Sequence, residues 1–247
     1  MGIADLHIHS IYSWDGTSTV SAILKKASHH LNLNVIAITD HDEIKGALEA
    51  VLLAPYYGIE VIPGIEISTK DGHLLGLFVN KKISPGLPLI ETLIQIGDLG
   101  GIAIAAHPSA NGMKSLNPSI IKKALDHPQA GKTLLGLEVF NASLVHMRSN
   151  QSAKELANQL PIATVGNSDA HLLWLIGKGT TSFPGRTAFD LRFALENRLT
   201  KVIYGKSKSN LAMIPHWLLR KSLRRAGMVS WNSSPSKPLQ FGRVIDS

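Results

Sequence analysis

The sequence predicts an α/β protein in which parallel strands form a closed or nearly closed β/α barrel. Short apolar runs alternate with amphipathic helical segments along residues 1–200, and the connections are long enough for neighbouring strands to pair in parallel. The chain has 247 residues, 44% of them hydrophobic, so it can bury one large core. A doubly wound open sheet has the same alternation, and the pattern alone leaves both architectures open.

About seven strands are expected from the apolar and β-branched runs. The Asp71-Gly72 pair predicts a tight turn before the fourth of them. The expected strands lie at about residues 5–9, 35–40, 59–67, 73–79, 102–106, 134–140 and 162–166.

Helices are expected between these strands from the helical spacing of apolar side chains and from end signals. The Thr-Ser-Thr run at residues 17–19 supplies N-cap hydroxyls for the first helix, and Gly58 ends the second. Asn117 and Pro118 begin a short helix. The expected helices lie at about residues 17–30, 43–57, 85–97, 117–126, 147–159 and 187–197.

The composition narrows the chemistry that the chain can perform. There is no cysteine, which excludes disulfides, thiolate metal sites and cysteine nucleophiles, so any metal must be held by nitrogen and oxygen ligands. No apolar run is long enough and free enough of charge to span a bilayer, and the N-terminus lacks the features of a secretory signal. A cytoplasmic protein is expected.

The net charge of +7 is concentrated near the C-terminus. Residues 1–200 hold 16 Lys and Arg against 17 Asp and Glu, a balance of −1, and residues 201–247 hold 9 against 1, a balance of +8. We expect a barrel domain over residues 1–205, a basic amphipathic helix over 206–229 and a flexible Ser- and Pro-rich tail over 230–247. The helix would pack on the barrel or contact RNA or an anionic surface.

Polar side chains mark the ends of the apolar runs. His7 and His9 alternate in the first run, and because side chains repeat every second residue along a strand, both point the same way. In a β/α barrel the carboxyl ends of the strands converge on one site. The candidate ligands at or near run ends, including His73 at the start of a run, are His7, His9, Asp15, His41, Glu66, His73, His107, Asp169 and His171.

Nine nitrogen and oxygen ligands are too many for one ion, so the pattern predicts two or three divalent ions. Without sulfur ligands, Zn²⁺, Mn²⁺ and Fe²⁺ are the metals that suit such a site. A cluster of this kind lowers the pKa of bound water to about 7 and stabilises charge on a phosphoryl group. Metal-assisted phosphate ester hydrolysis is therefore the first reaction class, and deamination and amide hydrolysis remain open on the residues alone.

The ordered segments resemble the motifs of the PHP family, the polymerase and histidinol phosphatase metallohydrolases. The resemblance covers about residues 3–200, and it implies a distorted (β/α)₇, TIM-like barrel with a trinuclear metal site. The matching motifs are His7-Ile8-His9-Ser10, Ser13-Trp14-Asp15-Gly16, Thr39-Asp40-His41, Pro63-Gly64-Ile65-Glu66, His73-Leu74-Leu75-Gly76, Ala106-His107-Pro108 and Ser168-Asp169-Ala170-His171.

The resemblance also implies how the ligands are shared among three ions, with Glu66 as a bridge. The implied sets are His7, His9, Glu66 and Asp169; Asp15, His41 and His171; and Glu66, His73 and His107. Asp15 stands where many relatives have histidine, as is common in the subgroup that resembles nucleotide phosphoesterases. All positions carry competent ligands, unlike the inactive form of the domain in some polymerases.

The implied activity is hydrolysis of a phosphate monoester by a metal-bound hydroxide. Only about 30 residues separate His73 from His107, where nucleotide phosphoesterases insert a helical domain over the site, so a more open site is expected. The expected substrate is a nucleotide, a 3′,5′-nucleoside bisphosphate or an oligonucleotide end. The alternatives are a histidinol-phosphate phosphatase and, from another class, a non-catalytic metal-stabilised module that binds nucleic acid.

Further candidates complete the predicted site. Asn141, Arg148 and Arg186 lie near predicted strand ends or in the last βα loop, and guanidinium forks match phosphate oxygens, so these three are predicted to bind substrate. Asp40, beside His41, is a candidate proton donor or a partner that holds a ligand in place. Asp40, Asp169 and His171 form the predicted catalytic set.

Overall fold

The computed structural model describes residues 1–31, 33–108, 115–143 and 149–205, together with Pro215, Leu218, Leu219 and Ser222. The chain divides into two compact units, Met1–Ser209 and Asn210–Ser247. The predicted basic helix over residues 206–229 and the predicted flexible tail over 230–247 lie almost entirely outside the described residues, so both stay predictions. The sheet and its helices belong to the first unit.

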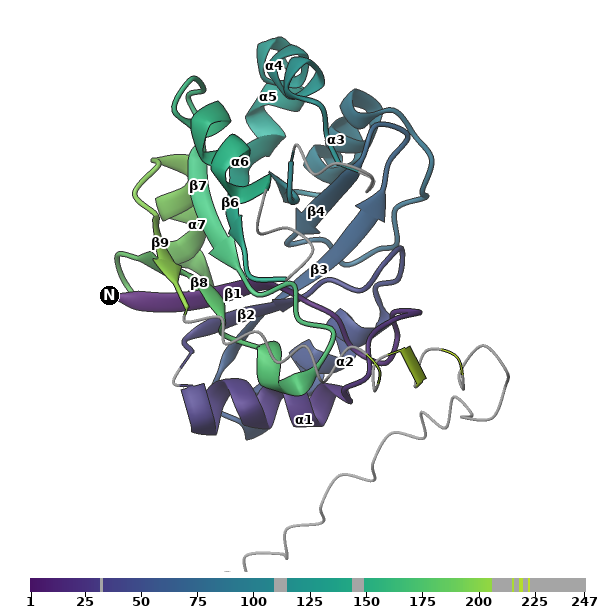
Figure 1. Cartoon of the computed structure of the whole chain (residues 1–247), viewed down its shortest axis with the longest axis vertical. Helices are drawn as coiled ribbons and strands as arrows, with labels where there is room; N and C mark the ends of the chain where they lie inside the picture. The colour runs from purple at the N-terminus through teal and green to yellow at the C-terminus, as the bar shows by residue number, and fades with distance from the viewer. Residues whose placement is uncertain are drawn as a thin grey trace, which may run out of the picture. The chain divides into compact units, whose positions relative to one another are not determined.

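The first unit is organised around a mixed sheet with the strand order β7-β6-β5-β4-β3-β2-β1-β8-β9 (Figure 1). Strands are parallel from β1 to β3 and from β5 to β7, whereas β4, β8 and β9 are antiparallel to their neighbours. The strands are β1 (Gly2–Ile8), β2 (Val35–Ile38), β3 (Glu60–Ser68), β4 (His73–Leu77), β5 (Ile102–Ala105), β6 (Leu134–Asn141), β7 (Ala163–Asn167), β8 (Gly179–Phe183) and β9 (Lys201–Tyr204).

The sheet curls so that β7 returns to the side of β1. The His9 amide donates to the Ala170 carbonyl (3.0 Å), and the Ala170 amide donates to the His7 carbonyl (3.3 Å). The side-chain oxygen of Asn167 accepts from the Leu6 amide (3.0 Å). These bonds make the sheet a nearly closed, distorted barrel, so the predicted fold class is confirmed.

Helices join the strands (Figure 1). They are α1 (Val20–Lys25) with the π-helical turn η1 (Lys26–His30), α2 (Lys45–Leu53) with the 3₁₀ turn η2 (Ala54–Tyr56), α3 (Leu89–Asp98), α4 (Pro118–Asp126), α5 (Ala130–Thr133), α6 (Ser149–Ala157), the 3₁₀ turn η3 (Leu173–Leu175) and α7 (Ala188–Glu196). Those from α1 to α6 cover the outer face of the sheet, whereas α7 packs against the inner layer.

Helix ends agree with the sequence where a strong cap is present. The side chain of Asn117 accepts from the Ser119 amide (2.9 Å), and α4 begins at Pro118 as predicted. Thr187 and Asp190 form a capping box at the start of α7, close to its predicted start. The strong local signals therefore fix these two boundaries.

Helix α3 begins at Leu89, four residues later than predicted. Gly86 has a φ of +82°, and Pro88 is extended, with a φ of −57° and a ψ of 149°. The Gly86 amide donates to the carbonyl of Ser68 at the end of β3 (2.8 Å) instead of to a helix carbonyl. The segment before α3 is thus a loop fastened to the end of β3.

Strands β8 and β9 are absent from the prediction. β8 pairs antiparallel with β1, with Gly2 opposite Phe183 and Ala4 opposite Thr181. The end of β8 therefore lies beside the start of β1. The loop that follows β8 opens at the end of the barrel opposite the carboxyl ends of β1 to β3.

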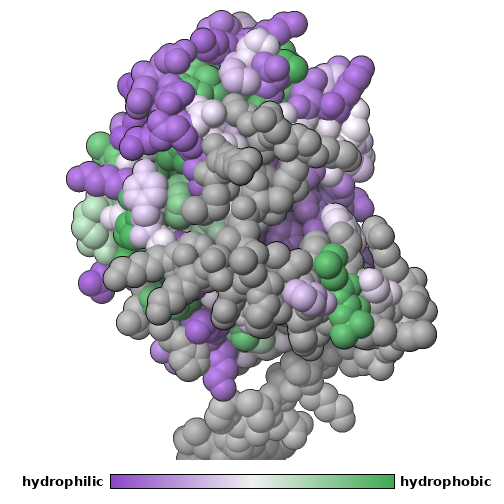
Figure 2. Space-filling view, viewed as in Figure 1, coloured by the Kyte–Doolittle hydropathy of each residue, from purple (hydrophilic) through white to green (hydrophobic). Residues whose placement is uncertain are grey.

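Two apolar layers stabilise the barrel. The inner layer combines Leu6, Leu75, Ile104 and Val165 from four strands with Leu191 of α7. The outer layer lies between the sheet and the helices from α1 to α6. The surface over α4 and α6 is mostly hydrophilic (Figure 2), as is typical of helices that bury only one face.

A β-bulge in β1 sets the direction of its polar side chains. Leu6 and His7 together stand opposite the single residue Ala37 of β2. Leu6 packs in the inner layer and Ile8 packs in the outer layer. Because of the bulge, the strict alternation of side chains is broken between Leu6 and Ile8. His7 can therefore lie on the inner side of the barrel, where the candidate site forms.

Candidate metal centre

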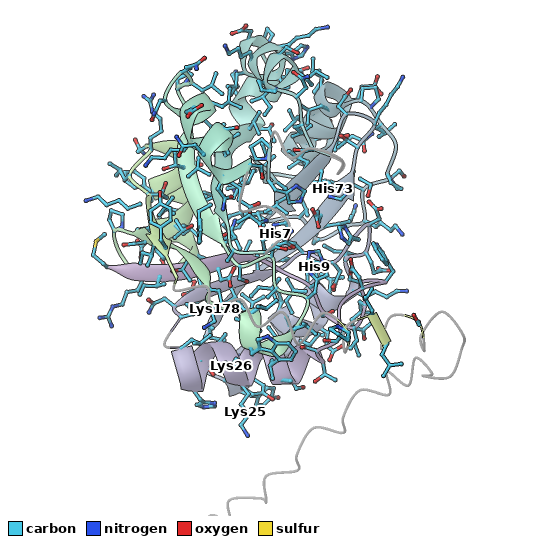
Figure 3. All side chains as sticks on the ribbon, viewed as in Figure 1. His7, His9, Lys25, Lys26, His73 and Lys178 are labelled. Atoms are coloured by element: carbon cyan, nitrogen blue, oxygen red, sulfur yellow. The ribbon has the colours of Figure 1, made fainter. Side chains whose placement is uncertain are left out.

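The predicted ligands converge at one end of the barrel. His7 and His9 come from the end of β1, and Glu66 lies near the end of β3, which runs parallel to β1 through β2. His73 is the first residue of β4, and because β4 is antiparallel to β3, its start lies at the same end. Figure 3 shows His7, His9 and His73 gathered in the centre of the barrel.

The deepest contacts join His7 and His9 to Glu66 and Asp169. The Nε2 atom of His7 lies 3.2 Å from Glu66 Oε2 and 3.4 Å from Asp169 Oδ1. The Nε2 atom of His9 lies 3.3 Å and 3.2 Å from the same two oxygens. All four side chains are buried, so two imidazoles and two carboxylates share a site that excludes water.

A second group lies around Asp15. Its Oδ2 atom is 3.0 Å from His171 Nε2 and 3.5 Å from His41 Nε2. Its Oδ1 atom accepts a hydrogen bond from Ser13 (2.6 Å), which orients the carboxylate. His41 and His171 are partly exposed, so this group lies nearer the surface than the first.

A third group lies on the other oxygen of Glu66. Its Oε1 atom is 2.9 Å from His73 Nδ1 and 3.1 Å from His107 Nε2, while His41 Nδ1 lies 3.1 Å from Oε2. Glu66 thus contacts residues from all three groups. This central place is the one expected of a carboxylate that bridges neighbouring ions.

The atoms of the centre suit divalent ions. Nitrogen and oxygen atoms that could hold a metal form four overlapping groups in the described residues, each with its atoms within 4.8 Å of one another. His7 Nε2 and Glu66 Oε2 are buried without a hydrogen bond, although they lie only 3.2 Å apart. Such buried polar atoms are costly unless a ligand satisfies them. Imidazole and carboxylate together are the donor set of zinc, manganese and iron.

Electrostatics in the metal-free centre are dominated by opposite charges in a buried space. Burial alone would raise the pKa of Glu66, but His41, His7 and His73 hold it well below its usual range. Burial would lower the pKa of His7, yet Asp169, Glu66 and Glu138 hold it well above. The pKa of His9 falls to about 4 because of burial and neighbouring imidazoles. The carboxylates are therefore ionised, as metal ligands must be.

Glu138, in the middle of β6, is a residue that sequence reasoning missed. Its Oε1 atom lies 3.1 Å from His7 Nδ1 and accepts from the Asn167 side chain (2.8 Å). Its Oε2 atom accepts from the His107 amide (2.8 Å) and from the Asn141 side chain (2.9 Å). The available signal was one acidic residue inside an otherwise apolar strand. Glu138 fixes the ring orientation of one predicted ligand and the backbone of another.

Asn141 lies in the centre, at the end of β6. Its amide nitrogen donates to Glu138 Oε2 (2.9 Å) and to Asp169 Oδ2 (3.1 Å), and its oxygen accepts from the Ser143 amide (2.9 Å). These hydrogen bonds engage both polar atoms of the Asn141 side chain, and one of them orients Asp169. They favour a positioning role over the predicted phosphate contact.

Of the other two predicted substrate residues, the structure describes only Arg186. Because β8 runs antiparallel to β1, the exposed Arg186 lies beyond the amino end of β1, and the structure does not bring it to the centre. The five residue-to-residue steps from Gly2 to His7 span roughly 16 Å of extended strand. Arg148 lies outside the described residues.

Asp40 lies beneath the loop that follows β1. Its carboxylate accepts from the Ser10 amide (2.6 Å) and from the Ser10 hydroxyl (2.7 Å). Burial raises the pKa of Asp40 to about 7. Because both oxygens are engaged by Ser10, the geometry favours a role in anchoring the loop over the predicted role of proton donor.

Comparison with known proteins places the chain in a family. The family model of the PHP domain matches residues 5–139, and the model described as PHP-associated matches residues 147–199. The chain belongs to the PHP domain family. With this membership it is a metal-dependent hydrolase. Among the described residues, no helix is long and apolar enough to cross a membrane.

Relatives and solved structures agree with this assignment. An uncharacterized protein of Methanocaldococcus jannaschii is 40% identical over 149 residues, which cover 56% of this chain and 81% of that protein. A 5′-3′ exoribonuclease of Haemophilus influenzae is 34% identical over 133 residues, covering 49% of this chain and 47% of the exoribonuclease.

One similar solved structure is a two-domain protein of Bacteroides vulgatus that is described as containing a predicted PHP-like metal-dependent phosphoesterase. It superposes with a TM-score of 0.64 at 20% identity, and the match covers 82% of this chain and 64% of that one. Endonuclease Q of Pyrococcus furiosus, a lesion-specific endonuclease, superposes with a TM-score of 0.55 at 17% identity over 81% of this chain and 57% of that one. These structures share the barrel-like fold.

We predict that replacing Glu138 with Gln weakens metal binding about 10- to 100-fold. Both carboxylate oxygens of Glu138 now face hydrogen-bond donors, and in Gln one of them would be replaced by an amide nitrogen, which cannot accept. Either the contact with His7 Nδ1 or the hydrogen bond from the His107 amide would therefore be lost. Metal titration of the metal-free protein measures the affinity. The matched control is Glu155→Gln on the exposed face of α6, and equal affinity in both variants would contradict the role given to Glu138.

We also predict that metal binding strengthens as the pH rises from about 6 to about 9. Burial would lower the pKa of His171, but the hydrogen bond and the charge of Asp15 raise it to about 9 in the metal-free protein. A metal must displace that proton, so acid opposes binding and each binding event releases protons. Calorimetry in two buffers of different ionisation enthalpy counts these protons, and an affinity independent of pH would refute the prediction.

Proposed function

We propose that this protein hydrolyses phosphate monoesters of nucleotides, 3′,5′-nucleoside bisphosphates or oligonucleotide ends. The observation that carries the proposal is the buried Glu66 carboxylate surrounded by imidazoles, with all nine candidate ligands gathered around it. Family membership favours phosphate esters over deamination and amide hydrolysis. The 5′-3′ exoribonuclease relative supports a nucleotide or oligonucleotide substrate.

The centre would hold two or three divalent ions, zinc, manganese or iron. The proposed ligand sets are His7, His9, Glu66 and Asp169; Asp15, His41 and His171; and Glu66, His73 and His107. When bound, the ions would activate water and neutralise the phosphoryl oxygens. Asn141 orients Asp169, and Ser13 orients Asp15, so the chain keeps both carboxylates aligned before substrate arrives.

Substrate would enter beside the partly exposed histidines. The side chains of His41, His73 and His171 are 10%, 13% and 20% exposed, whereas those of His7 and His9 are fully buried. The backbone also orients His171, because its Nδ1–H donates to the Asp169 carbonyl oxygen (3.0 Å). The exposed rim is thus the side from which a phosphate can reach the centre.

A cavity of about 750 Å³, a size typical of small-molecule sites, lies between the loop that follows β2 and the turn between β3 and β4. It is lined by Asp42, which follows His41, by Gly72, which precedes His73, and by Ser68, which pairs with His73. A substrate group in the cavity would therefore lie one residue along the chain from two candidate ligands, His41 and His73. This proximity supports a substrate larger than a bare phosphate.

The segment between His73 and His107 also supports an extended substrate. It forms β4, α3 and β5, and the buried residues Leu89, Leu93 and Ile96 of α3 pack in the outer layer of the core. Helix α3 therefore covers the outer face of the sheet. Within the described part of this segment, no element is placed over the candidate ligands, which favours an oligonucleotide end as substrate.

The test is phosphate release by Mn²⁺-loaded protein from AMP, 3′,5′-bisphosphoadenosine, histidinol phosphate and a short 5′-phosphorylated RNA. We expect release from one or more nucleotide substrates and a loss of about 1,000-fold in Asp169→Ala, because metal ions contribute several kcal/mol to stabilising the transition state. Asp126→Ala, at the exposed end of α4, is the matched control.

The outcomes separate the candidate functions. Preference for histidinol phosphate would identify a histidinol-phosphate phosphatase instead. Full activity in Asp169→Ala would refute the proposed centre. Silence on all four substrates by protein that binds metal and RNA would favour the non-catalytic nucleic-acid module.

A further inference from the structure

Trp14 is an exposed aromatic residue at the rim of the centre, and it takes no part in the proposed hydrolysis. Its indole ring stacks on the imidazole of His41, with centroids 5.7 Å apart and planes inclined by 21°. The residue is nevertheless 52% exposed. His41 in turn lies 3.1 Å from Glu66 and 3.5 Å from Asp15. A large aromatic surface therefore borders the candidate metal ligands directly.

The loop that carries Trp14 is held in one conformation. Ser10, at its start, is fastened to the buried Asp40 by two hydrogen bonds. The Ser13 amide donates to the Ser10 carbonyl (3.1 Å), and the Ser13 hydroxyl donates to Asp15 (2.6 Å). At Gly16 a Cβ atom would lie only 1.9 Å from the Ser10 carbonyl oxygen, so the loop can close this tightly only with glycine.

We propose that Trp14 is the platform on which the nucleobase of the substrate stacks. The inference rests on the proposed function for its class of substrate. A nucleotide places its base one sugar away from its phosphate, and Trp14 adjoins Asp15 in the chain and His41 in space. A phosphate at the centre and its own base on Trp14 can therefore be bound together.

The physical properties of the platform fit this partner. Aromatic rings favour offset stacking, and every base offers a π-face, so the contact accepts any base. Because the loop is already ordered, little conformational freedom is lost when the base binds. Trp14 would then select nucleotides over phosphate esters that lack an aromatic group, while leaving the identity of the base open.

Binding of uncleavable analogues tests this independently of turnover. Calorimetry on the Mn²⁺-loaded protein would compare the methylenephosphonate analogues of AMP and of ribose 5-phosphate. We expect Trp14→Ala to weaken binding of the AMP analogue about tenfold or more, since base stacking is worth about 1–3 kcal/mol and 1.4 kcal/mol is tenfold. The ribose analogue should change by less than about twofold, and Trp14→Phe should retain most of the affinity for the AMP analogue.

Phe189→Ala is the matched control, because Phe189 is a 77% exposed aromatic residue on α7. Equal losses for both analogues would show that Trp14 only supports His41, and no loss for the AMP analogue would show that the base binds elsewhere. Either result overturns the inference. A preference for the AMP analogue over the ribose analogue that depends on Trp14, in a protein that releases no phosphate, would uphold the inference and reject the proposed hydrolysis.

Discussion

The buried carboxylate of Glu66 is the interaction on which the site depends. Its two oxygens lie within 3.3 Å of five imidazoles, those of His7, His9, His41, His73 and His107. Removing a carboxylate from water costs several kcal/mol unless opposite charge and hydrogen bonds compensate. Here positive charge on the imidazoles supplies the compensation in the metal-free protein. Divalent ions would supply it once the protons leave, so the same geometry that stabilises Glu66 prepares the centre for metal.

Some side chains that close the barrel also support the candidate site, so a change in the strand arrangement would also change the site. Asn167 closes the barrel by accepting from the Leu6 amide, and its nitrogen donates to Glu138. Glu138 in turn contacts His7 of β1 and the amide of His107, which follows β5. A shift of β7 against β1 would therefore misplace the imidazoles. The near-closure of the sheet thus positions the metal centre as well as completing the core.

The alternation of His7 with His9 and the convergence of strand ends could be read from sequence because both follow from strand geometry. Glu138 could not, since its direction depends on the register of β6 against β7, where the pairing shifts between Glu138 and Phe140. The misplacement of Arg186 has a similar cause. A single sequence does not state strand direction, and β8 reverses to pair with β1. Local patterns therefore predicted which candidate side chains converge at this end of the barrel, while tertiary pairing determined what supports them.

The candidate ligands differ in burial, and this difference gives the buried and the partly exposed residues different roles. His7 and His9 lie where water is excluded, which strengthens electrostatic interactions and fixes their geometry. His41 and His171 lie at the rim, where an incoming phosphate can replace water without unfolding any element. The loop that follows β1 contributes to both the buried and the exposed parts of the centre, because it aligns the buried carboxylate of Asp15 and presents the exposed indole of Trp14. Asp40 anchors that loop through Ser10 and so supports the rim without being one of the candidate ligands.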